Sequence, residues 1–204
     1  MYKKALIVFL IAAFSNTCIK AQNNYTISYR STLDAADTLL LKGDYTPFDV
    51  VIQDSVSYCY YPFISTRPNW KPKISLGSGY WAKSCYTDAK KCMMLLQSGF
   101  YEKPRSQRLI EKKCDKGTWI ITDDKKEING YSCTRAYGTM NKLSYTVWFT
   151  QDLPHGFGPY MFTSLPGTIL EALMEEKGIL TRAVTIKNEG LPIVEPNFCK
   201  RIRE

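Results

Sequence analysis

The chain has 204 residues, about the length of one domain or one large β-sheet unit, and shows no internal repeat or low-complexity tract. Its 27 basic and 19 acidic residues give a formal net charge of +8, but the basic residues are spread along the chain. Because tracking a phosphate backbone needs clustered cations, this pattern predicts no nucleic-acid partner.

The N-terminus has the organisation of a secretory signal peptide. Lys3 and Lys4 precede an apolar run over residues 5–14, and a polar stretch follows that ends at Ala21. The apolar run is too short to span a bilayer, which needs about 20 residues. We therefore expect an exported protein with no transmembrane segment in its mature chain.

Cleavage after residues 1–21 leaves residues 22–204, which we expect to form a single β-rich domain. A lipoprotein signal ending at Cys18 is the alternative, although the residues before Cys18 are not the apolar and small ones that such a site uses.

Alternation of apolar and polar residues with a period of two predicts half-buried β-strands along most of the chain. Residues 49–60 alternate around a bend expected at Asp54, and their apolar face holds Val50, Ile52, Val56, Tyr58 and Tyr60. The prolines and glycines of residues 62–79 then predict a long loop. Further strands are expected over residues 25–30, 91–96, 107–114, 118–122, 131–137, 143–149 and 179–187.

Polar stretches with Gly or Asn separate the strands expected between residues 107 and 149. They cover residues 115–117, 123–130 and 138–142, and stretches of this kind close hairpins. We therefore predict a four-strand meander over this region.

Residues 168–177 carry conflicting signals. They are rich in strong helix formers, yet Pro166-Gly167 before them suits a type II turn, and residues 175–178 can close a hairpin onto the next strand. We predict a strand here. The expected fold class is mostly β, a single antiparallel meander sheet with few or no helices outside the signal peptide.

The cysteine content predicts disulfides. Removal of Cys18 with the signal leaves six of the seven cysteines, which allow up to three bridges and 15 connectivities in an oxidising compartment. The spacing best suited to a local bridge is that of Cys85 and Cys92, which flank a polar, hairpin-like stretch. A zinc site is set aside because the chain has no Cys-x-x-Cys pair and only one histidine, His155.

An ordered set of motifs runs from Trp119 to Ile186: Ile128-Asn-Gly-Tyr-Ser-Cys133, Val147-Trp-Phe-Thr150, Asp152-Leu-Pro154, Gly158-Pro159 and Leu165-Pro-Gly-Thr-Ile-Leu-Glu171. This order resembles the GLPGLI family of exported Gram-negative bacterial proteins and covers about the last half of the mature chain. Ser164 and Thr168 stand where the family has Gly and Leu.

The resemblance implies secretion, a largely antiparallel sheet and residence in the periplasm or at the outer membrane, with no established reaction. By analogy with lipoprotein carriers we expect a curved sheet, open like a half-barrel.

The Pro- and Gly-rich loop before residue 168 is the candidate contact surface for a partner or ligand. The alternative is that its prolines and glycines only steer one strand into the next. The candidate residues are His155, Phe157, Gly158, Pro159, Phe162, Leu165, Pro166 and Gly167.

No catalytic constellation emerges from the sequence. A histidine-dependent hydrolase or metal enzyme would have to use His155, and a Gly-x-Ser-x-Gly nucleophile elbow is absent. A soft copper site would combine residues 92–94 with His155 and Met161, but core methionines and a disulfide cysteine explain these positions better.

Aromatic residues cluster at Tyr58, Tyr60, Tyr61 and Phe63, where they line either a sugar or lipid groove or the surface and core of a sheet. We therefore predict a non-catalytic envelope protein with no cofactor that binds a hydrophobic ligand or an outer-membrane transporter component. An envelope hydrolase or metal-dependent enzyme using His155 is the alternative.

Overall fold

The computed structural model describes residues 24–32, 48–60, 82–98, 108–154, 156–159, 161–197 and 200–203. The signal peptide predicted at residues 1–21 and the loop predicted at residues 62–79 lie outside these residues. Within the described ranges, no helix has the length and apolar character needed to cross a membrane.

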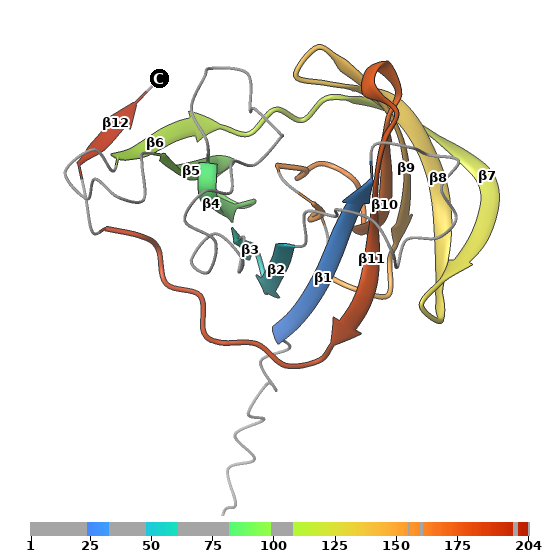
Figure 1. Cartoon of the computed structure of the whole chain (residues 1–204), viewed down its shortest axis with the longest axis horizontal. Coiled ribbons are helices and arrows are strands. Elements are labelled where there is room, and N and C mark those ends of the chain that lie inside the picture. The colour runs from blue at the N-terminus through green and yellow to red at the C-terminus, as the bar shows by residue number, and fades with distance from the viewer. Residues whose placement is uncertain are drawn as a thin grey trace, which may run out of the picture.

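The described residues form one 12-stranded sheet with the order β12-β6-β5-β4-β3-β2-β1-β11-β10-β9-β8-β7. It is strongly curved and does not close into a barrel, and its neighbours are antiparallel except for β12 beside β6 (Figure 1). The prediction of a mostly-β, open sheet is confirmed. The elements are β1 (Asn24–Thr32), β2 (Phe48–Gln53), β3 (Val56–Tyr60), β4 (Ala82–Asp88), β5 (Met93–Ser98), β6 (Arg108–Lys113), β7 (Thr118–Ile128), β8 (Tyr131–Met140), β9 (Leu143–Thr150), β10 (Thr168–Met174), the 3₁₀ turn η3 (Glu175–Lys177), β11 (Ile179–Lys187) and β12 (Arg201–Arg203).

The predicted four-strand meander is wrong in its first strand. β7, β8 and β9 form a meander, but β6 pairs with β5 and β12 near the other end of the sheet. The link between β6 and β7 does not close a hairpin, because Asp115 in this link bonds to the β8–β9 turn instead. One carboxylate oxygen accepts a hydrogen bond from Gly117 N at 2.9 Å, and the other accepts one from Asn141 N in the β8–β9 turn at 2.6 Å.

The two hairpin turns of the meander have left-handed backbone at both central residues. Asn129 and Gly130 have φ of 51° and 80°, and Asn141 and Lys142 have φ of 51° and 65°, as type I′ turns require. The turn expected to start at residue 123 instead begins at Asn129. Residues 123–126 belong to β7, whose pairing with β8 is irregular there.

The bend expected at Asp54 is a tight hairpin turn, in which Asp54 has φ of 50°. Its register pairs Ile52 with Ser57 and Val51 with Tyr58, and residues paired in this way lie on the same face of the sheet. Tyr58 therefore shares a face with Val51, not with Ile52. The prediction that Tyr58 shares the face of Ile52 is therefore wrong. Tyr58 lies on the convex, outer face of the sheet.

The segment with conflicting signals is a strand. β10 pairs with β9 and β11, and η3 with Gly178 at φ 60° closes the hairpin onto β11. Pairing on both sides outweighs the helix propensity of the sequence. The expected type II turn is wrong, since Gly167 is absent from the positive-φ glycines. A Cβ on Gly167 would lie 2.1 Å from the carbonyl oxygen of Thr150, so close backbone packing requires glycine here.

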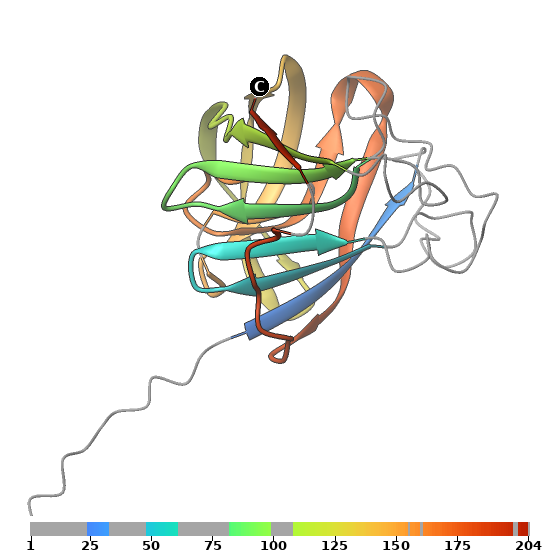
Figure 2. The ribbon, with the colours of Figure 1, turned by 90° about the vertical axis from the view of Figure 1, so that its left-hand side faces the viewer.

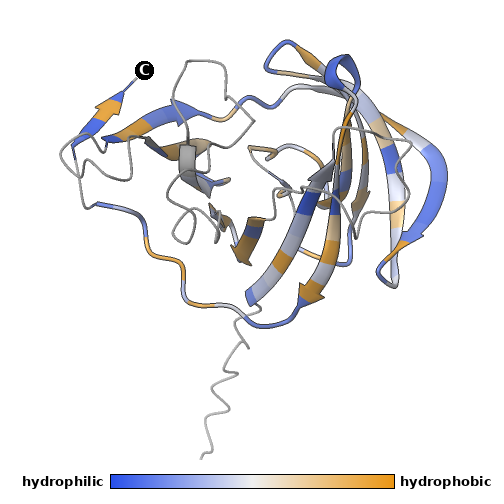
Figure 3. Ribbon diagram, viewed as in Figure 1, coloured by the Kyte–Doolittle hydropathy of each residue, from blue (hydrophilic) through white to orange (hydrophobic). Residues whose placement is uncertain are grey.

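The core lies inside the curve of the sheet, and the described part of the segment between β9 and β10 lies on this side of the sheet (Figure 1). Hydrophobic and hydrophilic residues alternate along β1 and β11, so each strand presents one apolar face to this interior (Figure 3). Strand residues such as Ile27, Val50 and Ile52 pack with Leu153 and Phe157 of the loop. The concave face is thus occupied by the chain itself.

Candidate ligand-binding groove

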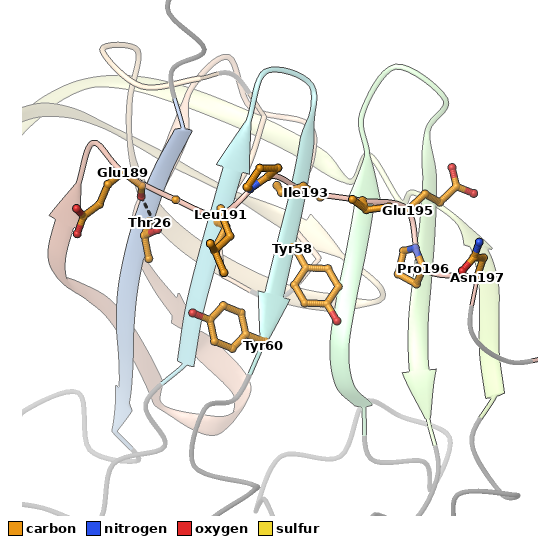
Figure 4. Close-up of a pocket in the computed structure, with 13 residues that line it drawn as sticks. Thr26, Tyr58, Tyr60, Glu189, Leu191, Ile193, Glu195, Pro196 and Asn197 are labelled. Carbon is orange, nitrogen blue, oxygen red and sulfur yellow. Dashed lines mark hydrogen bonds between the residues drawn. The ribbon is translucent and has the colours of Figure 1, made fainter.

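A C-terminal segment crosses the outer face of the sheet. Residues 188–197, here called the strap, leave β11 and run across β1 to β6 before β12 joins the sheet edge (Figures 2 and 4). Pro192 and Pro196 have no backbone N–H to donate to a strand ladder. The strap therefore lies across the strands as extended chain rather than pairing with them.

Hydrogen bonds fasten the first half of the strap to β1 and β2. The hydroxyl of Thr26 donates to the carbonyl of Glu189 at 2.6 Å, and the backbone N–H of Ile193 donates to Gln53 Oε1 at 2.8 Å. These bonds connect positions more than 130 residues apart and hold the strap close to the outer face of the sheet.

Ion pairs fasten the other end. The carboxylate of Glu195 lies 3.2 Å from Lys91 Nζ and 3.0 Å from Arg201 Nη1, and Arg201 and Arg203 both bind Glu111. Burial opposes ionisation of Glu195, but the hydrogen bonds from Lys91 and Arg201 outweigh it and lower the pKa of the carboxyl group. The strap is therefore held at both ends.

Between these fastenings, a groove of about 850 Å³ lies between the strap and the sheet and is open to solvent (Figure 4). Tyr58 and Tyr60 contribute two aromatic rings from the outer face of β3, with centroids 6.3 Å apart and planes inclined by 33°. A volume of this size lies in the range of small-molecule sites. The lining residues are Thr26, Val51, Tyr58, Tyr60 and the strap residues from Glu189 to Asn197.

The polar ends of the two tyrosines are engaged with the sheet. Tyr58 OH donates to Ser84 Oγ at 2.9 Å, and Ser84 in turn donates to Gln97 at 2.9 Å. Burial raises the pKa of Tyr60, and the nearby carboxylate of Asp49 raises it further. Both hydroxyl groups are therefore held against the sheet, and the rings present aromatic surface to the groove.

The groove is apolar in character. Val51, Pro192 and Ile193 line it, together with Leu191 and Val194, which are 82% and 78% exposed. Large aliphatic side chains left in water favour the binding of an apolar partner group. The lining carboxylates are already paired, Glu195 with Lys91 and Arg201 and Glu189 with Lys187. The groove therefore suits a ligand without a dense charge.

The candidate contact loop predicted from the sequence is mostly inside the protein. Phe157, Phe162 and Leu165 are 1%, 3% and 4% exposed, and Gly158, Pro159 and Gly167 are also buried. Pro166 is exposed, and His155 lies outside the described residues. The six buried residues pack in the interior, as the alternative interpretation of the loop expects.

Aromatic packing explains the loop's central phenylalanine. The ring of Phe162 meets that of Tyr145 edge-on at 5.1 Å between centroids and lies 5.9 Å from that of Trp119. Gly158 packs against Ile169, because a Cβ at position 158 would come within 2.8 Å of the Ile169 Cβ. Phe162 and Leu165 thus belong to a second group of packed buried side chains, which also includes Val147, Phe149 and Ile169.

The two departures from the GLPGLI pattern both make hydrogen bonds. Ser164 Oγ accepts one from Trp119 Nε1 at 2.8 Å, and Thr168 Oγ1 donates to the carbonyl of Pro154 at 2.5 Å. Ser164 is not among the residues with positive φ, so its backbone is not strained. Both hydroxyl groups are thus hydrogen-bonded at the two positions where the resemblance predicts Gly and Leu.

The predicted Cys85–Cys92 bridge is wrong in this structure, where both residues carry free thiols. The β4–β5 hairpin exists, but its register pairs Cys85 with Leu96, while Cys92 lies at the turn. Cys92 is four residues along β5 from Leu96, the partner of Cys85, which places the two cysteines roughly 13 Å apart along the strand direction. A disulfide requires Cα atoms within about 7 Å.

The strap is the part of the groove that sequence reasoning missed. The sequence indicates Tyr58 and Tyr60 as possible groove residues, but no local pattern in it places Leu191 or Ile193 beside them. The available signal was a run of aliphatic residues interrupted by Pro192 and Pro196 after the last long strand, a pattern typical of extended chain that packs without pairing.

The described ranges contain no group of three or more His, Cys, Asp or Glu side chains that could hold a metal ion. The fold and groove together define an open, curved β-sheet protein with a strapped outer face. No family model matches the chain, and no curated protein does.

Two structures of PNGF-II, in the P21 and C2 space groups, resemble this chain in fold. Their TM-scores are 0.64 and 0.63, with 13% and 14% sequence identity over 89% of this chain. The matched region is 31% of the PNGF-II chain, so this protein spans about a third of that protein's length. At this identity the likeness shows the fold alone.

Proposed function

We propose that this protein is an exported, non-catalytic binding protein of the cell envelope, related to the GLPGLI family, and that its ligand is an elongated hydrophobic molecule such as a fatty-acyl chain. The observation that carries the proposal is the groove of about 850 Å³ between the strap and the Tyr58–Tyr60 pair. The N-terminal signal pattern supports export.

The shape of the groove supports an elongated ligand. It follows the strap from Glu189 to Asn197 across several strands and is open along its length (Figure 4). Its aliphatic lining and the two tyrosine rings offer apolar contact, while the paired carboxylates at its ends offer little to a strongly charged ligand.

The test is direct titration of the purified protein with cis-parinaric acid, a fluorescent fatty acid. We expect saturable binding at one site, weakened about 5- to 30-fold by Tyr60→Ala, since the ring contributes about 1–2 kcal/mol of contact. Tyr137→Ala is the matched control, because Tyr137 is an exposed tyrosine on β8, outside the groove. The Tyr137→Ala protein should bind cis-parinaric acid with the same affinity as the unaltered protein.

Lipid extraction of the protein purified from its native envelope provides an independent check. Mass spectrometry should find a bound acyl-containing molecule. If cis-parinaric acid fails to bind, or binds equally to the Tyr60→Ala protein, and extraction returns no lipid, the proposed function is wrong.

A further inference from the structure

Cys92 and Cys114 come together at one corner of the sheet. Met93 and Lys113 are the last paired residues of β5 and β6, and Cys92 and Cys114 occupy the next rung. Cys114 N donates to the carbonyl of Cys92 at 3.0 Å, and Cys92 Sγ lies 3.6 Å from the carbonyl oxygen of Cys114. The β5–β6 register therefore continues by one residue pair, and Cys92 and Cys114 face each other directly across the two strands.

We propose that Cys92 and Cys114 form a disulfide that locks the β4–β5 turn to the β6–β7 corner. Directly opposed residues on antiparallel strands have Cα atoms about 4.5–5.5 Å apart, which lies inside the range that a disulfide spans. Both side chains are partly exposed, so an oxidant can reach them, whereas Cys85 and Cys133 are buried.

The two thiols also influence one another. Burial and the facing Cys92 thiol raise the pKa of Cys114 to about 12. Cys114 is therefore a poor first nucleophile.

The reaction is a thiol–disulfide exchange with a small-molecule or protein disulfide as oxidant. Cys92 attacks one sulfur of the oxidant, forms a mixed disulfide and releases the first thiol. Cys114 then attacks the Cys92 sulfur, forms the Cys92–Cys114 bond and releases the second thiol. Two electrons pass to the oxidant, and its two sulfurs take up the two protons that the cysteines lose.

The bridge has a consequence for the groove. Lys91, which binds Glu195 of the strap, belongs to the same four-residue turn as Cys92. Cys92 holds a left-handed backbone conformation in this turn, with φ of 49°. A bridge to Cys114 fixes the position of Lys91 and hence one fastening of the strap.

The test is peptide mapping of the full-length chain after oxidation. Reduced protein is incubated with oxidised glutathione, alkylated and digested with trypsin, which cuts after Lys91 and Lys113 and leaves each cysteine at the start of its own peptide. We expect peptides 92–105 and 114–116 to be joined by a bond that a reductant breaks. Separate recovery of both as alkylated thiols, or linkage of either to another cysteine, overturns the proposal.

Thermal unfolding supplies a second measurement. Oxidation should raise the melting temperature by about 5–10 °C in the unaltered protein and leave a Cys92→Ser/Cys114→Ser double variant unchanged. A Cys133→Ser variant should keep the shift. An equal shift in the double variant contradicts the assignment. Ligand binding measured on reduced protein is unaffected by either result, so this inference and the proposed function fail separately.

Discussion

The carboxylate of Glu195 lies 3.2 Å from the ammonium group of Lys91, although 104 residues separate the two positions in the chain. Glu195 also binds Arg201 of the edge strand β12, and Arg201 binds Glu111 of the neighbouring β6. The strap is therefore fastened by charge at the end where the chain approaches β12. Because these groups are partly exposed, the fastening is weak enough to open without unfolding the sheet.

Glu195→Gln should loosen the strap and leave the rest of the protein intact. The variant loses two charge-assisted contacts, so amide hydrogen exchange in residues 191–197 should rise about 5-fold or more, while the melting temperature falls by less than about 2 °C. Hydrogen exchange with mass spectrometry measures this directly. Glu189→Gln is the matched control, since Glu189 forms an exposed ion pair with Lys187 where the strap leaves β11. Equal exchange in both variants would show that Glu195 does not hold the strap.

Gly167→Ala should destabilise the protein strongly, by about 2–4 kcal/mol. The added Cβ would lie 2.1 Å from the carbonyl oxygen of Thr150, so β9 and the start of β10 must move apart. Gly130→Ala is the comparison, because Gly130 has φ of 80° but nothing within 4 Å of its Cβ position, and it should cost about 1 kcal/mol. Urea unfolding at equilibrium measures both. A larger loss at Gly130 would mean that the backbone angle matters more than the close contact.

Strand content was predictable because each strand carries its own period-two pattern. In β9, Tyr145, Val147 and Phe149 are buried as their alternation predicts, and Trp148, the exception on the polar face, lies under the ammonium group of Lys126 at 4.7 Å. In β10 the type II turn expected at Pro166-Gly167 is absent, and pairing with β9 and β11 outweighs the helix propensity of the sequence. Local signals were therefore sufficient for β9 but not for β10.

Strand order was not predictable from local signals. The link of Asp115 and Gly117 looks like a hairpin turn in sequence, but its side-chain bonds send the chain to the other end of the sheet. The faces of Tyr58 and Tyr60 depended on a single turn at Asp54, since a shift of one residue exchanges the two faces of a strand. The groove escaped prediction because its two walls, the outer face of β1–β3 and the strap, come from opposite ends of the chain.

Glu171→Gln should lower the free energy of unfolding by about 1–3 kcal/mol. Glu171 is 6% exposed on β10 and binds Lys126 Nζ at 2.5 Å and the guanidinium group of Arg182. The amide retains the shape of the side chain but not its charge, so two partly buried cations lose their partner. Urea unfolding gives the difference. Glu127→Gln, at an exposed position of β7, should change stability by no more than about 0.5 kcal/mol.

Cys85 should make the reduced protein less stable as the solution becomes alkaline. Burial raises the pKa of its thiol from 9.0 to about 11 in the folded protein. Between these values the unfolded chain releases a proton that the folded protein retains, so the free energy of unfolding falls as pH rises and is greatest below pH 9. Two pKa units correspond to about 2–3 kcal/mol.

The contribution of Cys85 can be isolated by substitution. Urea unfolding of the unaltered protein and of Cys85→Ala at pH 8 and at pH 11, both in reductant, gives two losses of stability. The loss should be about 2–3 kcal/mol smaller in the variant, because Cys114 and Cys133, whose pKa values are also raised, are present in both proteins and cancel in the comparison. Equal losses would mean that the folded protein ionises Cys85 as readily as the unfolded chain does, and that its side chain is reached by water.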